Sequence, residues 1–364
     1  MKRAFAVLLA YVAVLGASNV GAALPRPATP VVTGPTTTDS SAPVFRFRAR
    51  GAVRFLCALD STKLRRCASR YSRALTVGRH ALRVQGVGRT GLRSRVRTHI
   101  VVVLAPPLQF NYPGQVAVEP NGTLLVAESS GRLARIEPGT GTIATATAVQ
   151  RPFGVIAAPG VVYFSDASAV RRIDTSGVIS TVAQFASDVG PLALAANGDL
   201  YVMTAARVFR LVGGQAPAEP YAGSGIEGDG GDGGAALAAQ IRAPHGLAVA
   251  PDGALLISDT GNNRVRRVDP ATRIITPIAT VRNPYGVAIG PDGVLYIASV
   301  EDDRVLRVDG SGAIAPFAVG LESASSLAFD AAGTLYVTEG NTASARIWRV
   351  TRDGRSSPLR RSGS

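Results

Sequence analysis

The chain has 364 residues, more than one hydrophobic core usually accommodates, so we expect two domains. A hydrophobic content of 46% excludes a disordered chain, and 40 glycines and 23 prolines beside only 18% charged residues favour an all-β fold with many turns. The formal net charge of +14 is compatible with contact to an anionic surface.

The first residues are typical of an export signal. Lys2 and Arg3 precede an almost unbroken apolar run over 4–17, and small residues at 21–23 suit a cleavage site. We therefore predict a signal peptide over 1–23 and a protein that is secreted or associated with the cell envelope. An uncleaved membrane anchor is the alternative, although the run is short for a membrane span.

The next two segments differ in pattern. Residues 24–41 are rich in proline, threonine and serine and have no apolar period, which predicts a linker. Residues 42–104 contain short alternating runs such as Phe45-Arg46-Phe47-Arg48, bounded by glycine and serine. Such runs predict the strands of a small β-sandwich.

The chain has two cysteines, Cys57 and Cys67. In an exported protein an even pair so close in sequence predicts a disulfide, and no nearby histidine pair completes a metal site. The stretches around them, residues 55–60, 67–69 and 77–84, resemble a family of bacterial extracellular immunoglobulin-like modules. The resemblance implies an immunoglobulin-like sandwich over 42–104, stapled by its cysteines, with a structural or spacing role.

The positive charge is concentrated in this front part. Residues 24–104 hold 16 Lys and Arg against 2 Asp and Glu, whereas residues 105–364 hold 21 against 23. The basic module could lie against an anionic cell wall or membrane surface. Alternatively, arginine simply covers the polar faces of strands. No base-reading motif is present, so we expect no nucleic-acid partner.

From residue 105 the chain repeats itself with a period of about 40 residues, the signature of β-propeller blades. The clearest copy contains PHGLAV (244–249), the turn Asp252-Gly253, LLISD (255–259) and RVRRV (264–268). The spacing predicts a six-bladed β-propeller over 105–355 and an Arg/Ser-rich tail over 356–364. Either 105–110 or 355–361 is expected to close the ring. The copies begin, at separations of 39, 39, 53, 40 and 40 residues, at Pro113, Pro152, Pro191, Pro244, Pro284 and Ala324.

These repeats resemble the NHL repeat family, most strongly in the copy that begins at Pro244. Residues 221–241, which include GDGGDGG (228–234), also look like the long loop between blades in that family and account for the 53-residue separation. The resemblance implies a six-bladed ring and, most often, binding rather than catalysis. Related propeller families include lyases and lactonases.

A candidate site follows from the topology of a blade. The first strand begins, and the antiparallel second strand ends, at the same mouth of the central channel. We place the variable residue of each Pro-x-Gly motif there, at Gly114, Phe153, Leu192, His245, Tyr285 and Ser325. The second strands end at Glu128, Asp166, Thr204, Asp259, Ser299 and Glu339. Residues predicted to bind a cation, sugar or peptide are therefore Glu128, Phe153, Asp166, His245, Asp259, Tyr285 and Glu339. Alternatively, the aspartates cap turns.

The residues favour binding over catalysis. His245 is the one histidine after residue 105, which argues against zinc lyases that need several histidine ligands. The favoured hypothesis is a monomeric binding or scaffold protein without a cofactor, whose channel mouth takes a glycan, peptide or protein ligand. The alternative is a lyase or gluconolactonase-like hydrolase that holds a divalent cation with Glu128, Asp166, Asp259 or Glu339.

Overall fold

The computed structural model describes residues 25–138, 143–340 and 345–360, and it divides into two compact units, 1–104 and 105–364. The predicted signal peptide over 1–23 lies outside the described residues. Within them, no helix has the length and apolar character needed to cross a membrane. Each unit is considered separately below.

The first unit, which we call the front unit, consists of two sheets around one core. Alternate residues of β3 and β4, including Phe45, Phe47 and Phe55, point inward against Leu82 and Val84 of β7. One sheet has the order β1 (Val31–Thr33), β3 (Val44–Arg48), β6 (Arg70–Ser72). The other has the order β2 (Thr37–Thr38), β8 (Arg97–Val103), β7 (Gly78–Val87), β4 (Arg54–Leu59), β5 (Arg65–Cys67).

The segment expected to be a linker, residues 24–41, contains two of these strands. β1 pairs with β3 in antiparallel fashion, and β2 pairs with β8 in parallel fashion. Val31, Val32 and Thr33 are β-branched, and Val32 packs against the core, so the stretch gains by pairing despite its prolines. Pro30 and Pro35 lie outside both strands, where no ladder hydrogen bond is lost. The predicted disulfide between Cys57 and Cys67 is confirmed and joins β4 to β5.

The second unit, which we call the repeat unit, contains six four-stranded antiparallel sheets among its described residues. Numbered in chain order, the first three sheets comprise β9 (Pro113–Val118), β10 (Leu124–Glu128), β11 (Arg132–Ile136), β12 (Ile143–Ala148); β13 (Val155–Ala158), β14 (Val161–Asp166), β15 (Ala169–Asp174), β16 (Ile179–Gln184); and β17 (Leu192–Leu194), β18 (Leu200–Met203), β19 (Val208–Leu211), β20 (Ala218–Ala222).

The last three sheets comprise β21 (Gly246–Val249), β22 (Leu255–Asp259), β23 (Arg264–Val268), β24 (Ile275–Thr280); β25 (Pro284–Ile289), β26 (Leu295–Ser299), β27 (Arg304–Val308), β28 (Ile314–Val319); and β29 (Leu327–Phe329), β30 (Leu335–Thr338), β31 (Ile347–Val350), β32 (Ser356–Pro358). Three short 3₁₀ turns accompany them, at Val212–Gly214, Ala236–Ala238 and Thr260–Asn262.

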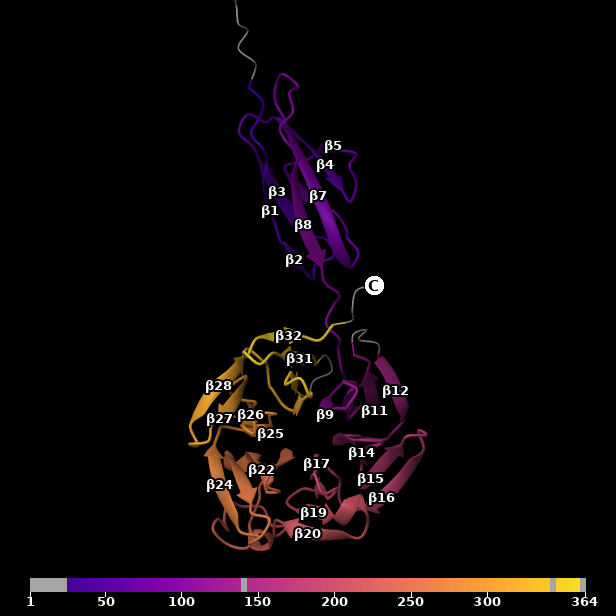
Figure 1. Cartoon of the computed structure of the whole chain (residues 1–364), viewed down its shortest axis with the longest axis vertical. Coiled ribbons are helices and arrows are strands. Elements are labelled where there is room, and N and C mark those ends of the chain that lie inside the picture. Colours follow the sequence, from indigo (N-terminus) through magenta and orange to yellow (C-terminus); the bar gives the residue numbers. More distant parts are fainter. Residues whose placement is uncertain (1–24, 139–142, 341–344, 361–364) are drawn as a thin grey trace, which may run out of the picture. The chain divides into compact units, whose positions relative to one another are not determined.

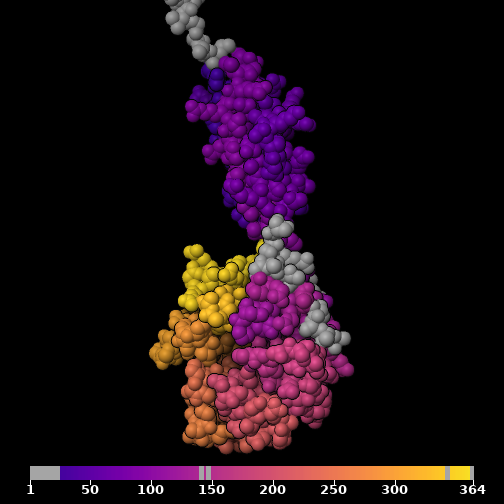
Figure 2. Space-filling view, turned by 45° about the vertical axis from the view of Figure 1, so that its right-hand side comes forward, coloured from indigo at the N-terminus to yellow at the C-terminus, as the bar shows by residue number. Residues whose placement is uncertain are grey.

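The six sheets form a closed ring (Figure 1). The first strand of each sheet is innermost and contacts the first strand of the next, and β29 contacts β9. Second strands such as β10 and β22 are buried along their whole length, because neighbouring sheets cover both of their faces. In the space-filling view consecutive sheets pack side by side without a break, from the first in magenta to the sixth in yellow (Figure 2).

Both terminal segments take part in closing the ring. Residues 356–358, predicted to lie in a tail, form β32, the outermost strand of the sixth sheet. The Leu108 N–H then donates to the Leu359 carbonyl (2.9 Å), and the Phe110 N–H donates to that of Ala345 (2.8 Å). Leu108 and Phe110 are buried beside Leu359. Both segments therefore add apolar side chains to the core between the sixth and the first sheet.

The glycine of the Pro-x-Gly motif lets the innermost strands approach each other. A Cβ on Gly154, Gly246 or Gly286 would overlap a carbonyl oxygen of the next sheet, at Gly190, Tyr285 and Ser325 respectively. The repeat therefore requires glycine because of close packing around the channel rather than because of a turn.

The long loop before the fourth sheet is held by a buried arginine. Arg266 has no exposed side-chain surface, and its guanidinium contacts Asp232 of the GDGGDGG segment at 2.6 Å. It also donates to the Gly230 and Gln240 carbonyls at 3.2 and 2.6 Å. The loop thus folds over its own sheet and adds partners to a buried cation that also lies 3.3 Å from Asp259 of the same sheet.

Candidate functional site

Strand register places six equivalent residues around the channel. In the fourth sheet the predicted variable residue His245 lies four residues before Val249, which pairs with Leu255 of the second strand. The equivalent pairs in four other sheets have the same offset. They confirm the predicted positions of Gly114, Phe153, Tyr285 and Ser325. In the third sheet, however, Leu194 pairs with Leu200, so the equivalent residue is Gly190. The assignment of Leu192 was wrong by two residues because Pro191 occupies the glycine position of the motif and imitates its start.

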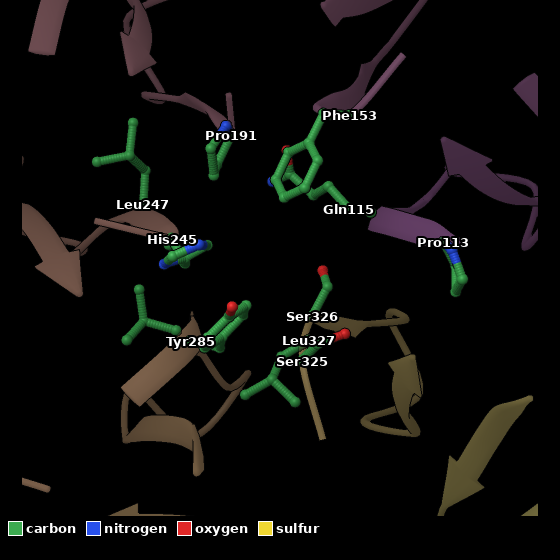
Figure 3. A pocket seen from close by; sticks show the side chains of 14 residues that line it. Pro113, Gln115, Phe153, Pro191, His245, Leu247, Tyr285, Ser325, Ser326 and Leu327 are labelled. Atoms are coloured by element: carbon green, nitrogen blue, oxygen red, sulfur yellow. The ribbon is translucent and has the colours of Figure 1, made fainter. Parts of the chain in front are cut away.

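Three of the predicted site residues come together in the channel. Phe153, His245 and Tyr285 line a narrow cavity with a free volume of about 80 Å³, together with Gln115, Pro191 and Ser325 (Figure 3). Phe153, Pro191 and His245 also line a wider cavity of about 500 Å³ that reaches over the second and third sheets. The two cavities adjoin at these three residues, and we call them together the channel mouth.

His245 and Tyr285 form a parallel stack across the boundary between the fourth and fifth sheets. Their ring centroids are 4.0 Å apart and their planes differ by 19°. His245 Nδ1 donates to the Ala243 carbonyl at 2.8 Å, which leaves Nε2 as the acceptor of the neutral ring. Burial lowers the pKa of His245 and raises that of Tyr285, so both rings are uncharged at neutral pH.

Gln115 is a site residue that the sequence analysis missed. It stands where other repeats carry glycine, and its side chain reaches from the first sheet to the third. Its Nε2 donates to the Leu192 carbonyl (2.8 Å), and its Oε1 accepts from the N–H groups of Leu192 (3.0 Å) and Val155 (3.1 Å). The departure from glycine in the motif was the available signal. The amide narrows the channel and fixes three sheets to each other.

A second group of residues gives the wider cavity its polar character, and of these the sequence analysis placed only Thr204 at the mouth. Arg151 and Asp188 form an exposed ion pair at 3.0 Å on its wall, and Ser129, Ser187 and Thr204 supply hydroxyl groups. Gly190 adds no side chain at the channel position, which explains why the cavity widens at the third sheet. This part of the site can accept both a flat apolar face and hydrogen bonds.

The four predicted carboxylates do not line the channel mouth. Glu128 is fully buried, accepts from the Asn111 N–H at 2.7 Å and pairs with Arg132 at 2.5 Å. Asp166 likewise accepts from the Gln150 N–H at 2.7 Å and pairs with Arg171 at 3.1 Å. These carboxylates hold the chain that enters each sheet.

Asp259 also holds the chain that enters its sheet, whereas Glu339 is held by two side chains at its third strand. Asp259 accepts from the Arg242 N–H at 2.9 Å and lies 3.3 Å from Arg266. Glu339 accepts from Arg346 at 2.7 Å and from the indole N–H of Trp348 at 3.0 Å. The prediction failed because second strands lie one strand spacing, about 4.8 Å, further from the axis, and arginines of the third strands draw the carboxylates outward.

A metal centre finds no support in the donor set. Across the described ranges, no three histidine, cysteine, aspartate or glutamate side chains are grouped so that they could hold a metal ion. The carboxylates that such a centre would need are the four that arginines and other N–H donors already occupy.

Comparisons with known proteins agree with this architecture. Residues 242–268 match the NHL repeat model. Among curated proteins, none matches the sequence. Virginiamycin B lyase from Staphylococcus aureus is similar in structure, at 17% identity and a TM-score of 0.52, over 71% of this chain and 89% of that one.

Two further solved structures are similar. A gluconolactonase from Xanthomonas campestris shares 19% identity at a TM-score of 0.55, over 67% of this chain and 87% of its own. The PQQ-bound aldose sugar dehydrogenase from Streptomyces coelicolor shares 17% at 0.53, over 67% and 95%. At such identities the likeness establishes a β-propeller fold and no activity.

Proposed function

We propose that this chain is a secreted or cell-surface binding protein whose channel mouth takes a glycan or peptide ligand. The observation that carries the proposal is the conjunction of Phe153 and the His245–Tyr285 stack with a cavity of about 500 Å³ that bears the exposed Arg151–Asp188 pair. Concave sites lined by aromatic rings and a few polar groups are the usual form of ligand sites.

The proposal includes a specific architecture for each unit. The six sheets of the repeat unit are taken as the blades of a six-bladed NHL-type propeller, since each follows the repeat and contacts its two neighbours. The front unit is taken as an immunoglobulin-like module, since its two sheets share one core and carry the Cys57–Cys67 bridge.

We prefer binding over catalysis because the acidic residues are already engaged. A lyase or lactonase that works through Glu128, Asp166, Asp259 or Glu339 would have to release each from its arginine and from the N–H groups it accepts. Removing one partner of such a buried pair is costly, on the order of 3–5 kcal/mol. The stacked rings of His245 and Tyr285 offer flat faces for contact with a ligand.

A ligand screen on the full chain tests the proposal. Calorimetric titration with glycans, peptides and lactones should identify a ligand whose affinity falls at least tenfold in Tyr285→Ala. The matched control is Tyr336→Ala, which removes a half-buried tyrosine of the sixth sheet that lies outside the channel mouth. Turnover of a lactone that depends on a divalent cation and is lost in Glu128→Gln would instead establish the enzyme.

We further propose that the front unit contacts an anionic surface. Arg46 and Arg48 project from the exposed face of β3, and Arg70 of β6 lies directly opposite Arg46. Asp60 of the same unit pairs with His80 at 2.6 Å. Like charges placed opposite each other destabilise a sheet, so this face is better explained by a partner than by folding.

A further inference from the structure

The channel mouth continues outward into a second cavity over the third sheet. This outer cavity has a volume of about 480 Å³ and shares Ser187, Thr204 and Ala205 with the wider cavity of the channel mouth. It extends to Phe185 at the end of the second sheet and to Phe209 on β19. The shared lining makes one groove that runs from the channel to the rim.

Short connections leave the groove open at its sides. In the second sheet Asp166 pairs directly with Ala169, so only Ala167 and Ser168 connect the second and third strands. In the third sheet the Thr204 N–H donates to the Arg207 carbonyl at 2.8 Å, which closes a tight turn over two alanines. The corresponding connections in the fourth and fifth sheets, residues 260–263 and 300–303, are four residues long and carry larger side chains.

Aromatic rings stand at both ends of the groove. At the inner end are Phe153 and the stack of His245 on Tyr285. At the outer end Phe185 and Phe209 meet edge to face, with centroids 5.3 Å apart. Between the two ends lie the hydroxyl groups of Ser187 and Thr204.

The charges along the groove are balanced. Arg151 and Asp188 pair with each other in the inner part, and Arg207 and Glu227 line the outer part. A lining with equal numbers of both signs does not select a polyanion or a polycation. It offers donors and acceptors to a ligand that is itself neutral and rich in hydroxyl groups.

We propose that this groove binds a linear neutral oligosaccharide, which extends from the channel mouth to the Phe185–Phe209 pair. The inference rests on the proposed binding function and adds the ligand class and an outer subsite. Sugar rings combine an apolar C–H face, which stacks on aromatic rings, with a rim of hydroxyl groups that suits serine, threonine, arginine and aspartate. A peptide that adds to a sheet needs an open strand edge, whereas this groove crosses the connections between strands.

The experiment measures binding against ligand length. Cello-, chito- and malto-oligosaccharides of one to six units are titrated into the full chain by calorimetry. Affinity should rise with length in one of the three series, and Tyr285→Ala should weaken all lengths of that series. Phe209→Ala should weaken only the longer members, by about tenfold, because only they reach the outer pair.

Two variants guard against trivial loss of structure. Phe317→Ala removes an aromatic ring from another edge-to-face pair, with Tyr296 on the fifth sheet, and should leave binding unchanged. If Phe209→Ala unfolds, the milder Phe209→Leu keeps much of the apolar volume but removes the ring face, and it should show the same dependence on length.

The outcomes separate the two proposals. If Tyr285→Ala weakens binding but Phe209→Ala weakens short and long sugars equally or not at all, the outer subsite is wrong and the channel site stands. If a peptide binds through Tyr285 and no neutral sugar does, the oligosaccharide is wrong. If no glycan or peptide responds to Tyr285→Ala, the proposed function fails as well.

Discussion

Gln115 of the first sheet is hydrogen-bonded to both backbone groups of Leu192 in the third. Its Nε2 donates to the Leu192 carbonyl at 2.8 Å, and its Oε1 accepts from the Leu192 N–H at 3.0 Å. The same Oε1 accepts from the Val155 N–H in the second sheet. One side chain therefore satisfies the backbone of two neighbouring sheets at the wall of the narrow cavity.

Replacing Gln115 with alanine should destabilise the repeat unit. The variant removes the partner of three backbone groups, and an unsatisfied buried group costs about 1–3 kcal/mol unless water enters. Urea denaturation should show a lower midpoint. Gln184→Ala is the control, since its Nε2 bonds only the Ser168 hydroxyl at an exposed site. Equal stability of the two variants would mean that water replaces the amide at no cost.

Adding one methyl group at Gly286 should also destabilise the ring. A Cβ there would overlap the Ser325 carbonyl oxygen of the next sheet, and overpacking of this kind costs about 1–3 kcal/mol. Gly310→Ala provides a matched control, because a Cβ at that position meets no atom within 4 Å. Thermal unfolding compares the two, and similar melting temperatures would contradict close packing between the fifth and sixth sheets.

Arg266→Met should be more damaging than any substitution of a surface arginine. The variant leaves the buried Asp259 with fewer partners and releases Asp232 from the loop over the fourth sheet, which predicts a loss on the order of 3 kcal/mol. Arg267→Met removes partly exposed pairs with Asp252 and Asp269. An ion pair at a protein surface is typically worth only about 0–1 kcal/mol. Hydrogen exchange should show increased exchange of loop 228–234 in the first variant alone.

Two histidines should give stability changes of opposite sign with pH. Burial lowers the pKa of His245 in the folded state. Its contribution to the free energy of unfolding is therefore complete above the pKa of the unfolded chain, about 6.5, and is lost as the pH falls toward the lower pKa of the folded state. Hydrogen bonds to Asp60 and the Thr76 carbonyl raise the pKa of His80, so its contribution is complete below about 6.5 and is lost as the pH rises.

The test subtracts the stability of each glutamine variant from that of the parent across pH 4–8, roughly the range in which histidine titrates. The difference for His245→Gln should shrink on the acidic side, and that for His80→Gln on the alkaline side. Parallel curves for both variants would show that neither ring changes its protonation on unfolding.

The repeat made the propeller architecture predictable, because its glycines, turn dipeptides and apolar strands recur at a nearly constant spacing. Phe153, His245 and Tyr285 line one cavity because the motif itself fixes their place at the innermost strands, and their role in binding stays a prediction. The carboxylates were misplaced because the direction of a side chain depends on its partners. Arginines such as Arg132 and Arg171 recur in the third-strand motif, but the motif alone does not show that the carboxylates turn toward them.

Other features depended on single departures from the repeat. Pro191 shifted the alignment of the third sheet. Gln115 occupies the glycine position of the motif, but its bridging hydrogen bonds could be seen only in the ring, which brings Leu192 and Val155 to it. The strands within 24–41 were missed because a proline-rich composition outweighed three consecutive β-branched residues, whose partner β3 lies further along the chain.

The arginine face of the front unit should bind polyanions. Arg46, Arg48 and Arg70 are exposed on one sheet, and each arginine near an anionic surface contributes about 1 kcal/mol. Replacing all three with glutamine should weaken binding to dextran sulfate at low salt by at least tenfold.

The control replaces Arg89, Arg93 and Arg95, which lie outside the strands of this unit, and changes the net charge equally. The face variant should also be slightly more stable, because Arg46 and Arg70 no longer repel each other. Equal weakening in both triple variants would show that overall charge alone attracts the polymer, and an unchanged affinity in both would remove the front unit as the point of contact.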